Sequence, residues 1–217
     1  MVMEYMPHGN LRDFLILHSM KQDDETEVDQ NECSQDGVIL TDNQMVQFAR
    51  DVANGMAFLA RQEVIHRDLA ARNVLIDANL TCKVSDFGLA CHVTDLEMAK
   101  RFHHETPLPV RWMAPEALLR GIYSQMSDVW SFGVVMWEIA SRGEKPYPGI
   151  SAKDVVIFLK DGNKMVPPRS CEQKICNIMN SCWEETPDQR PKFEDLVEKF
   201  DNILDVEHDY LLLKFVH

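Results

Sequence analysis

The sequence predicts a mainly α-helical protein with one small β-hairpin, in one domain or most of one. Its length of 217 residues lies within the usual span of a single domain. Apolar residues recur at helical spacing through most of the second half, whereas only two short runs are rich in β-forming residues. A composition of 45% hydrophobic and 26% charged residues is typical of globular chains, and no apolar run approaches the ~18 residues of a membrane span.

The first predicted elements are a helix and then the hairpin. Thr41 and Gln44 have the spacing of a capping box, in which the first side chain binds the main-chain N–H three residues later. The runs 74–76 and 82–85 are β-prone and are separated by a polar turn that begins at Asp77. The apolar residues that predict the helix after Thr41 are Met45, Phe48, Ala49, Val52, Met56 and Leu59.

Four further helices are predicted in the second half of the chain. Residues 128–140 are apolar nearly all round, which is typical of a helix buried on every side, so we expect this helix at the centre of the fold. Ser151 with Asp154 predicts the start of a second helix that runs through Leu159. The apolar stripes in 175–183 and 193–204 predict the other two, with Pro191 near the first turn of the last.

The net charge of −13 is concentrated in one segment. Residues 21–36 hold seven acidic side chains and a single lysine, without apolar periodicity, so we predict a solvated or disordered insertion over about 19–38. Because an acidic chain is repelled by phosphates, nucleic acid is excluded as an expected partner. The six cysteines form no C-x-x-C pair and no signal segment opens the chain, which favours a reducing, cytoplasmic compartment.

Three polar residues flank the predicted hairpin. If Asn73 opens its first strand and Asp86 closes its second, antiparallel pairing brings the two side chains together at one end. An amide oxygen and a carboxylate suit a hard cation such as Mg²⁺, which takes its remaining ligands from phosphate and water. Asp68, five residues before Asn73, is then placed to accept a hydroxyl proton beside the metal. The sequence therefore predicts phosphoryl transfer to an alcohol.

These residues also lie in motifs of a known family. Residues 66–73 read HRDLAARN and 86–88 read DFG, so this part resembles the catalytic loop and metal-binding motif of protein kinases. Further similar motifs follow in order: APE at 114–116, SDVWSFG at 127–133, CW at 182–183 and RP at 190–191. The resemblance covers residues 1–205, as the hinge and the C-terminal lobe of a kinase domain, and leaves 206–217 as a tail.

The resemblance implies a tyrosine kinase that uses ATP and Mg²⁺. The runs AAR at 70–72 and PVRWM at 109–113 are similar to tyrosine kinase signatures, and the acidic insertion resembles the kinase insert of receptor tyrosine kinases with split domains. By this resemblance Asp68 is the catalytic base, Arg72 steadies the base or the transferred phosphoryl group, and Asn73 and Asp86 bind the metal. Pro109 would pack against the tyrosine of a protein substrate.

Other roles are likewise implied by the resemblance. Residues 3–11 read MEYMPHGNL and resemble the hinge between the two kinase lobes, so Met3 would be the gatekeeper beside the nucleotide. Glu4 and Met6 would bind adenine through their main chains, Leu75 would lie under the adenine ring, and Asp13 near the ribose. Structural roles are expected for His66, Arg67, Phe87, Gly88, Asp128, Glu116 and Arg190. Among these, Asp128 would accept main-chain N–H groups of the catalytic loop, and Glu116 would form an ion pair with Arg190.

The sequence also departs from the family. No G-x-G run and no strand lysine precede the catalytic loop, although kinases use both to hold the ATP phosphates. We therefore expect the chain to be nearly inactive by itself and to need an N-terminal lobe as its partner. The alternative is a catalytically inert lobe that binds partners or competes with intact kinase. Tyr210 would either dock an SH2-type partner once phosphorylated or lie in a tail packed on the last helix.

Overall fold

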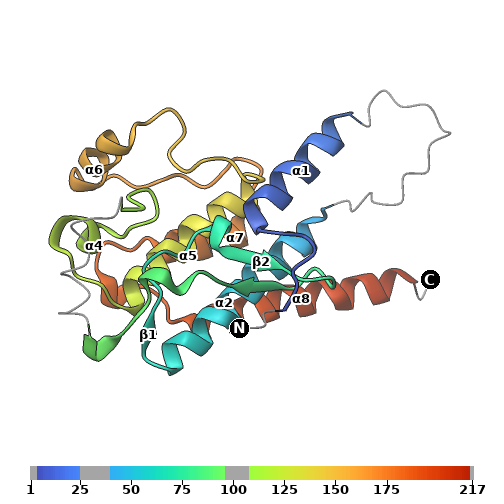
Figure 1. The fold of residues 1–217 in the computed structure, drawn as a ribbon. Helices are drawn as coiled ribbons and strands as arrows, with labels where there is room; N and C mark the ends of the chain where they lie inside the picture. Colours follow the sequence, from blue (N-terminus) through green and yellow to red (C-terminus); the bar gives the residue numbers. More distant parts are fainter. Residues whose placement is uncertain (1–3, 25–39, 96–107, 216–217) are drawn as a thin grey trace.

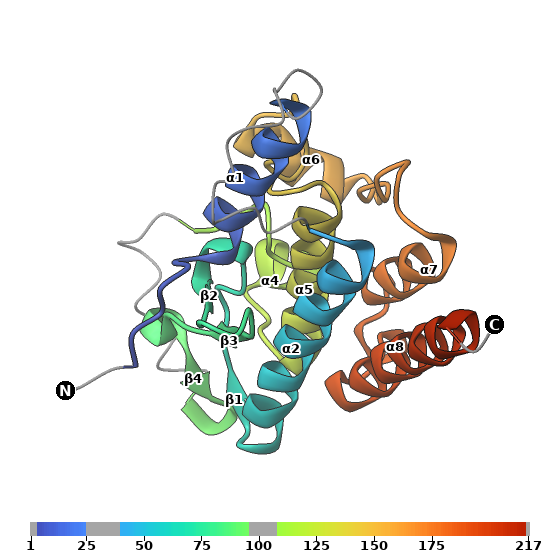
Figure 2. The same ribbon diagram turned by 90° about the vertical axis from the view of Figure 1, so that its right-hand side faces the viewer.

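Helices make up most of the computed structural model, which describes residues 4–24, 40–95 and 108–215 (Figure 1). The predicted class, mainly α with a small hairpin, is confirmed. Two sheets of two strands each lie on one side of the helical body (Figure 2). The helices of the body are α1 Leu11–Asp24, α2 Asp42–Arg61, α4 Pro115–Arg120, α5 Gln125–Ala140, α6 Ala152–Lys160, α7 Gln173–Cys182 and α8 Phe193–Phe215.

Helix α5 is the centre of the fold, as the sequence predicted. Ser124 caps its first turn by accepting a hydrogen bond from the Ser127 N–H, and Ser127 binds the Ser124 N–H in return. All residues from Ser127 to Ile139 are buried, because α2, α7 and the loops around the sheets cover the helix on different sides. A helix enclosed in this way must be apolar nearly all round, which explains its composition.

The other predicted helices also form. The Thr41 hydroxyl accepts a hydrogen bond from the Gln44 N–H and caps α2, and the Ser151 side chain caps α6 in the same manner. Helix α2 packs between α5 and α8 (Figure 2). The last helix, α8, extends beyond the predicted end at residue 204, to Phe215.

The two sheets hold two loops against each other. The predicted hairpin pairs β2 Val74–Ile76 with β3 Cys82–Val84, in a register that sets Val74 opposite Val84. The second sheet, β1 Val64–Ile65 with β4 Cys91–His92, was not predicted, because a strand of two residues carries no periodicity. The loop from β1 to β2 and the loop from β3 to β4 are therefore fixed at both ends.

Helix α1 was not predicted. Asn10 begins it by accepting a hydrogen bond from the Asp13 N–H, and Leu11 and Leu15 are fully buried on one face. The helix continues to Asp24, so the first residues of the acidic insertion are helical rather than irregular. Residues 25–39, the remainder of that insertion, lie outside the described residues.

Three short 3-10 turns complete the site side of the fold and one lies before α8. They are η1 Ala71–Asn73, η2 Phe87–Leu89, η3 Val93–Asp95 and η5 Pro187–Gln189. Within the part of the chain that the structure describes, no helix combines the length and apolarity needed to cross a bilayer. The five cysteines described here, which exclude Cys33, are all free thiols.

Gly133 provides a test of how tightly α5 is packed. A Cβ atom at this position would lie 2.6 Å from Trp183 Nε1 and 2.9 Å from Cys182 Cβ. Alanine normally stabilises a helix interior by about 1 kcal/mol relative to glycine. We predict instead that Gly133→Ala lowers the free energy of unfolding by about 1–3 kcal/mol, because the added methyl group would overpack the core around α7. Denaturant unfolding measures the change, with the exposed Lys153→Ala as control; a more stable Gly133→Ala protein would contradict this packing.

Candidate functional site

Asp68 and Asn73 are in direct contact. Asp68 lies in the loop after β1, and Asn73 ends the 3-10 turn that leads into β2. The Asn73 Nδ2 group donates hydrogen bonds to the Asp68 main-chain oxygen at 2.7 Å and to Asp68 Oδ2 at 3.0 Å. The amide is thereby oriented with its nitrogen toward Asp68, which leaves Asn73 Oδ1 as the atom available to a cation.

Asp86 stands at the same end of the hairpin. Strand pairing continues past β3, since the Ser85 N–H donates to the Asn73 main-chain oxygen at 2.9 Å. Asp86 then adopts a left-handed conformation, with φ of 59°, and accepts a hydrogen bond from the Gly88 N–H. A Cβ at Gly88 would lie 3.2 Å from Asp86 Oδ1, so glycine permits this close turn. The sequence prediction that Asn73 and Asp86 flank one end of the hairpin is therefore confirmed in position.

The pKa of the Asp68 carboxyl is raised above its ordinary value, and its neighbours act on this pKa in opposite directions. Burial raises its pKa above the ordinary value, whereas the Arg72 cation and the Asn73 hydrogen bond lower it, and the nearby Asp86 carboxylate raises it again. Arg72 forms an ion pair with Asp68, and its guanidinium lies 4.3 Å above the centre of the Trp112 ring. A half-buried carboxylate with a raised pKa is a stronger proton acceptor than an exposed one.

Helix α5 holds the loop that carries Asp68. Asp128 Oδ2 and Oδ1 accept hydrogen bonds from the His66 N–H at 2.7 Å and the Arg67 N–H at 3.0 Å. Burial raises the pKa of Asp128 to about 6, although both backbone bonds act in the opposite direction. This loop has no regular ladder in which to pair its N–H groups, so the buried carboxylate takes that role. The expectation that Asp128 accepts these bonds is confirmed.

His66 and Phe87 connect the two loops. The buried His66 ring donates from Nε2 to the Ser85 main-chain oxygen at 3.0 Å and accepts the Asp68 N–H at Nδ1, at 3.3 Å, an arrangement that fits the neutral Nε2–H tautomer. The half-exposed Phe87 ring lies beside it, with centroids 5.4 Å apart. The His66 ring therefore fixes the distance between the Asp68 loop and the Asp86 loop.

Arg67 is buried in a left-handed conformation, with φ of 69°. Its guanidinium lies 4.4 Å over the Tyr123 ring, and Nη1 is 3.8 Å from Cys91 Sγ. Its Nε and Nη2 atoms are buried without a hydrogen-bond partner among the described residues. Residues 96–107, which lie between η3 and α4, are outside those residues.

Glu138 is a site residue that sequence reasoning missed. It is fully buried near the end of α5, and its Oε2 accepts hydrogen bonds from the Ala71 N–H and from Trp112 Nε1, both at 2.9 Å. Burial raises the pKa of Glu138 to about 7, against these two hydrogen bonds and the more distant Arg72 and Arg12 charges. The signal was present, because Glu138 is the one charged side chain in the apolar run from 129 to 139.

The predicted nucleotide-binding segment lies beside the hairpin. Gly9 accepts the Ile76 N–H at 2.9 Å, and Leu75 forms a bridge with Asn10. The Glu4 carboxylate contacts Lys83 Nζ at 2.7 Å. The Met6 main-chain oxygen accepts the Gly9 N–H, and the Asp13 carboxylate accepts a hydrogen bond from Asn10 Nδ2 at 2.8 Å. Pro109 is half-buried, and its main-chain oxygen accepts the Trp112 N–H. Met3 lies outside the described residues.

Comparison with known proteins agrees with this geometry. The family described as protein tyrosine and serine/threonine kinase matches residues 1–200. The chain belongs to this family. It is 40% identical to fibroblast growth factor receptor homolog 1 of Drosophila melanogaster over 97% of the chain, and 45% identical to tyrosine kinase receptor Cad96Ca of the same species over 81%. It is 41% identical to a fibroblast growth factor receptor of Halocynthia roretzi over 94%. These alignments cover 29%, 23% and 28% of the relatives' own lengths.

The resemblance to a kinase C-terminal lobe also extends to an ion pair far from Asp68. Arg190 Nη1 and Nη2 contact Glu116 Oε1 at 2.6 Å and Oε2 at 3.0 Å, and the Arg190 side chain is fully buried. Arg190 also donates to the Met126 main-chain oxygen at 2.8 Å and lies 5.1 Å over the Trp130 ring. The predicted pair is therefore present, and it joins α4 and α5 to the turn before α8.

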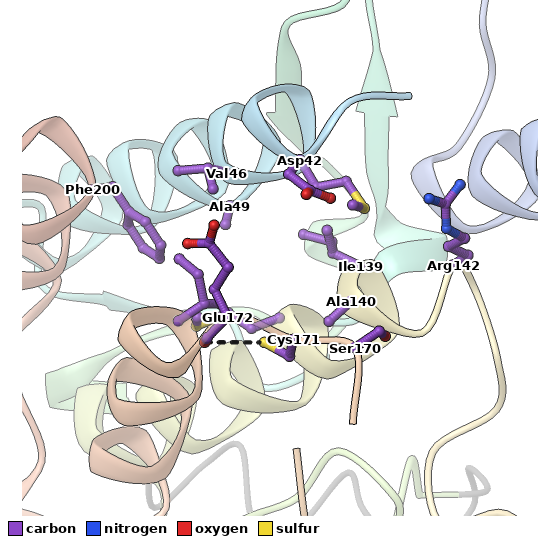
Figure 3. Close-up of a pocket in the computed structure, with 13 residues that line it drawn as sticks. Asp42, Val46, Ala49, Ile139, Ala140, Arg142, Ser170, Cys171, Glu172 and Phe200 are labelled. Carbon is purple, nitrogen blue, oxygen red and sulfur yellow. Dashed lines mark hydrogen bonds between the residues drawn. The ribbon is translucent and has the colours of Figure 1, made fainter. Parts of the chain in front are cut away.

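A separate cavity lies in the helical body of the kinase lobe (Figure 3). It has a volume of about 120 Å³ and opens between α2, α5, α7 and α8, with Val46, Ile139 and Phe200 among its apolar walls. The Cys171 thiol at its rim donates to the Glu172 main-chain oxygen at 3.8 Å. None of the predicted site residues lines this cavity. The candidate site for phosphoryl transfer therefore remains the cluster around Asp68.

The Glu116–Arg190 pair allows a test by double-mutant cycle. We predict that Glu116→Ala lowers the free energy of unfolding by about 3–5 kcal/mol, because it leaves the buried Arg190 charge without its partner. Arg190→Met should also destabilise the protein, but the double variant should lose less than the sum of the two single changes, since no unpaired charge remains. Denaturant unfolding of the four proteins gives the coupling energy. Additive losses would show that the two side chains do not stabilise each other.

Proposed function

We propose that the protein containing this chain is a protein tyrosine kinase, which transfers the γ-phosphoryl group of ATP to tyrosine hydroxyl groups of proteins. The contact of Asp68 with Asn73 and Arg72, beside Asp86, is the observation that carries this proposal. Membership of the kinase family and similarity to proteins named as receptor tyrosine kinases support it. The run 70–72, which resembles the tyrosine kinase signature, favours tyrosine over serine or threonine.

In the proposed reaction Asp68 is the base. The tyrosine oxygen forms a bond to the γ-phosphorus while the bond from that phosphorus to the ADP oxygen breaks, and the phenolic proton passes to the Asp68 carboxylate. The contacts of Asp68 support this role, because Asn73 Nδ2 and Arg72 hold both carboxylate oxygens in fixed directions. Arg72 remains about one-third exposed, so it is also placed to face a phosphoryl group.

We propose Asn73 and Asp86 as ligands of Mg²⁺. The donor set fits: Asn73 presents Oδ1 because its nitrogen is engaged, and Asp86 is an exposed carboxylate at the same end of the hairpin. Mg²⁺ needs only a few oxygen ligands from the protein, because it completes its coordination with phosphate and water. When bound, the ion would neutralise charge on the ATP phosphates. The His66 bridge would keep the two ligands at a constant separation.

The remaining sequence-based roles are proposed in the same way. Glu4 and Met6 would bind adenine through their main chains, Leu75 would form the floor of that pocket, and Asp13 would lie near the ribose. Their position beside the hairpin supports this, since Gly9 and Asn10 join the segment to β2. Met3 as gatekeeper and Pro109 as the platform for the substrate ring rest on the resemblance alone.

We further propose that the parent protein acts in receptor tyrosine kinase signalling. The names of the similar proteins support this proposal. Because the reaction requires ATP, this region would lie on the cytoplasmic side of a membrane if the parent is a receptor. Tyr210 falls within α8, where phosphorylation would create a docking residue for an SH2-type partner.

The decisive experiment replaces the proposed base. In the full-length product of the gene that encodes this chain, Asp68→Asn should lower kcat by about 10²- to 10⁴-fold, because an amide cannot accept the phenolic proton. The KM for ATP should change little, since Asp68 is not proposed to bind nucleotide. Initial rates of labelled phosphate transfer from Mg·ATP to a Glu–Tyr copolymer measure the effect.

The controls separate this chemistry from other effects. Asp188→Asn removes an exposed carboxylate outside the site and should retain the wild-type rate. A peptide with phenylalanine in place of tyrosine should accept no phosphate. Transfer only to serine or threonine peptides, no transfer at all by the wild-type protein, or full activity of Asp68→Asn would each rule out the proposed function.

A further inference from the structure

We propose that Glu138 is a positioning residue, which ties the Asp68 loop to the segment carrying Trp112 and thereby fixes Arg72 against Asp68. Its consequence for the reaction rests on the proposed function above. The coupling between the four side chains is a property of the fold and is testable without activity. It follows from two hydrogen bonds, one ring contact and one ion pair.

The first connection is from Glu138 to the Asp68 loop itself. Glu138 Oε2 accepts the Ala71 N–H at 2.9 Å, and Ala71 begins the 3-10 turn that ends at Asn73. Asp128 accepts the N–H groups of His66 and Arg67, at the other end of the same loop. Asp128 and Glu138 are ten residues apart on α5, a rise of about 15 Å, so one rigid helix holds the loop at two separated points.

The second connection passes through an aromatic ring. The same Glu138 oxygen accepts Trp112 Nε1 at 2.9 Å, which fixes the plane of the indole. Arg72 lies 4.3 Å over that ring and forms the ion pair with Asp68. The Ser131 hydroxyl, about two turns before Glu138 on α5, donates to the Trp112 main-chain oxygen at 2.7 Å. The position of the Arg72 charge relative to Asp68 therefore depends on contacts that α5 supplies.

Packing alone does not account for a carboxyl group at this position. Glu138 is fully buried, and its Oε1 has no hydrogen-bond partner among the described residues. The charged groups that lower its pKa, Arg72 of the loop and Arg12 of α1, do not offset the burial that raises it to about 7. An apolar side chain of similar size would avoid this desolvation. What it could not do is accept two N–H groups from two different segments.

The test measures hydrogen exchange at the Arg72 guanidinium and at the Ala71 amide by NMR in the 217-residue chain. Because the ion pair with Asp68 and the Trp112 ring shield the Arg72 guanidinium, Glu138→Leu should speed exchange of its N–H groups several-fold as Arg72 loses its fixed position. Glu138→Gln should leave this exchange near the wild-type rate, since the amide oxygen still accepts both N–H groups. Hydrogen exchange at the Ala71 amide should be more than about tenfold faster in Glu138→Leu and nearly unchanged in Glu138→Gln.

Gly133→Ala is the matched control for loss of stability. It disturbs the same helix, but on the side that faces α7 and Trp183. It should leave exchange at Arg72 and Ala71 unchanged even if it destabilises the fold. Should Glu138→Leu fail to fold, Trp112→Phe and Trp112→Leu make the comparison instead: the first keeps a ring under Arg72, and the second removes it. Only the second should then speed exchange at Arg72 to the full extent.

Activity gives an independent second readout in the full-length protein. Glu138→Leu should lower kcat by about tenfold or more, with the KM for ATP within about twofold. If exchange at Arg72 responds equally to Glu138→Leu and Gly133→Ala, or to neither, the proposal is overturned. If the wild-type protein transfers no phosphate, the proposed function fails, while the NMR comparison still decides whether Glu138 positions Arg72.

Discussion

The bonds from Asp128 to the His66 and Arg67 N–H groups are the constraint on which the site depends. The loop before β2 cannot pair its main chain with a neighbouring strand, and Arg67 is held in the left-handed region. A buried N–H without an acceptor is costly, so a carboxylate on the central helix accepts the N–H groups that a neighbouring strand would otherwise bind. The apolar burial of α5 stabilises this carboxylate in one position. The geometry of the candidate site is therefore a consequence of helix packing.

Around this fixed loop, the charges of the site oppose one another. Burial raises the pKa of Asp68, and Arg72 and Asn73 lower it through an ion pair and a hydrogen bond. Asp86 adds a second carboxylate nearby, which would be unfavourable without a cation to share. The family relationship and the donor set thus lead to the same proposal, by independent routes. The hydrogen bond from Trp112 to Glu138 and the contact of the Trp112 ring with Arg72 also connect the position of Arg72 to α5.

Much of the site could be predicted because its residues lie close together in sequence. Asn73 and Asp86 flank one hairpin, and a hairpin of known register sets its two ends side by side whatever the remainder of the fold. The caps at Thr41 and Ser151 were predictable for the same reason, since a cap joins residues three apart. Strands β1 and β4 and the role of Glu138 were not, because each joins segments separated by more than twenty residues.

The sequence by itself therefore determined the mainly helical class, the hairpin and the residue types that suit phosphoryl transfer. Periodicity and capping act over a few residues and leave a pattern in the order of side chains. Only the tertiary structure decided which buried acidic residue meets which loop. Asp128 and Glu138 both lie in one apolar helix, and their separate contacts with the Asp68 loop follow from how that helix is packed, which no local pattern records.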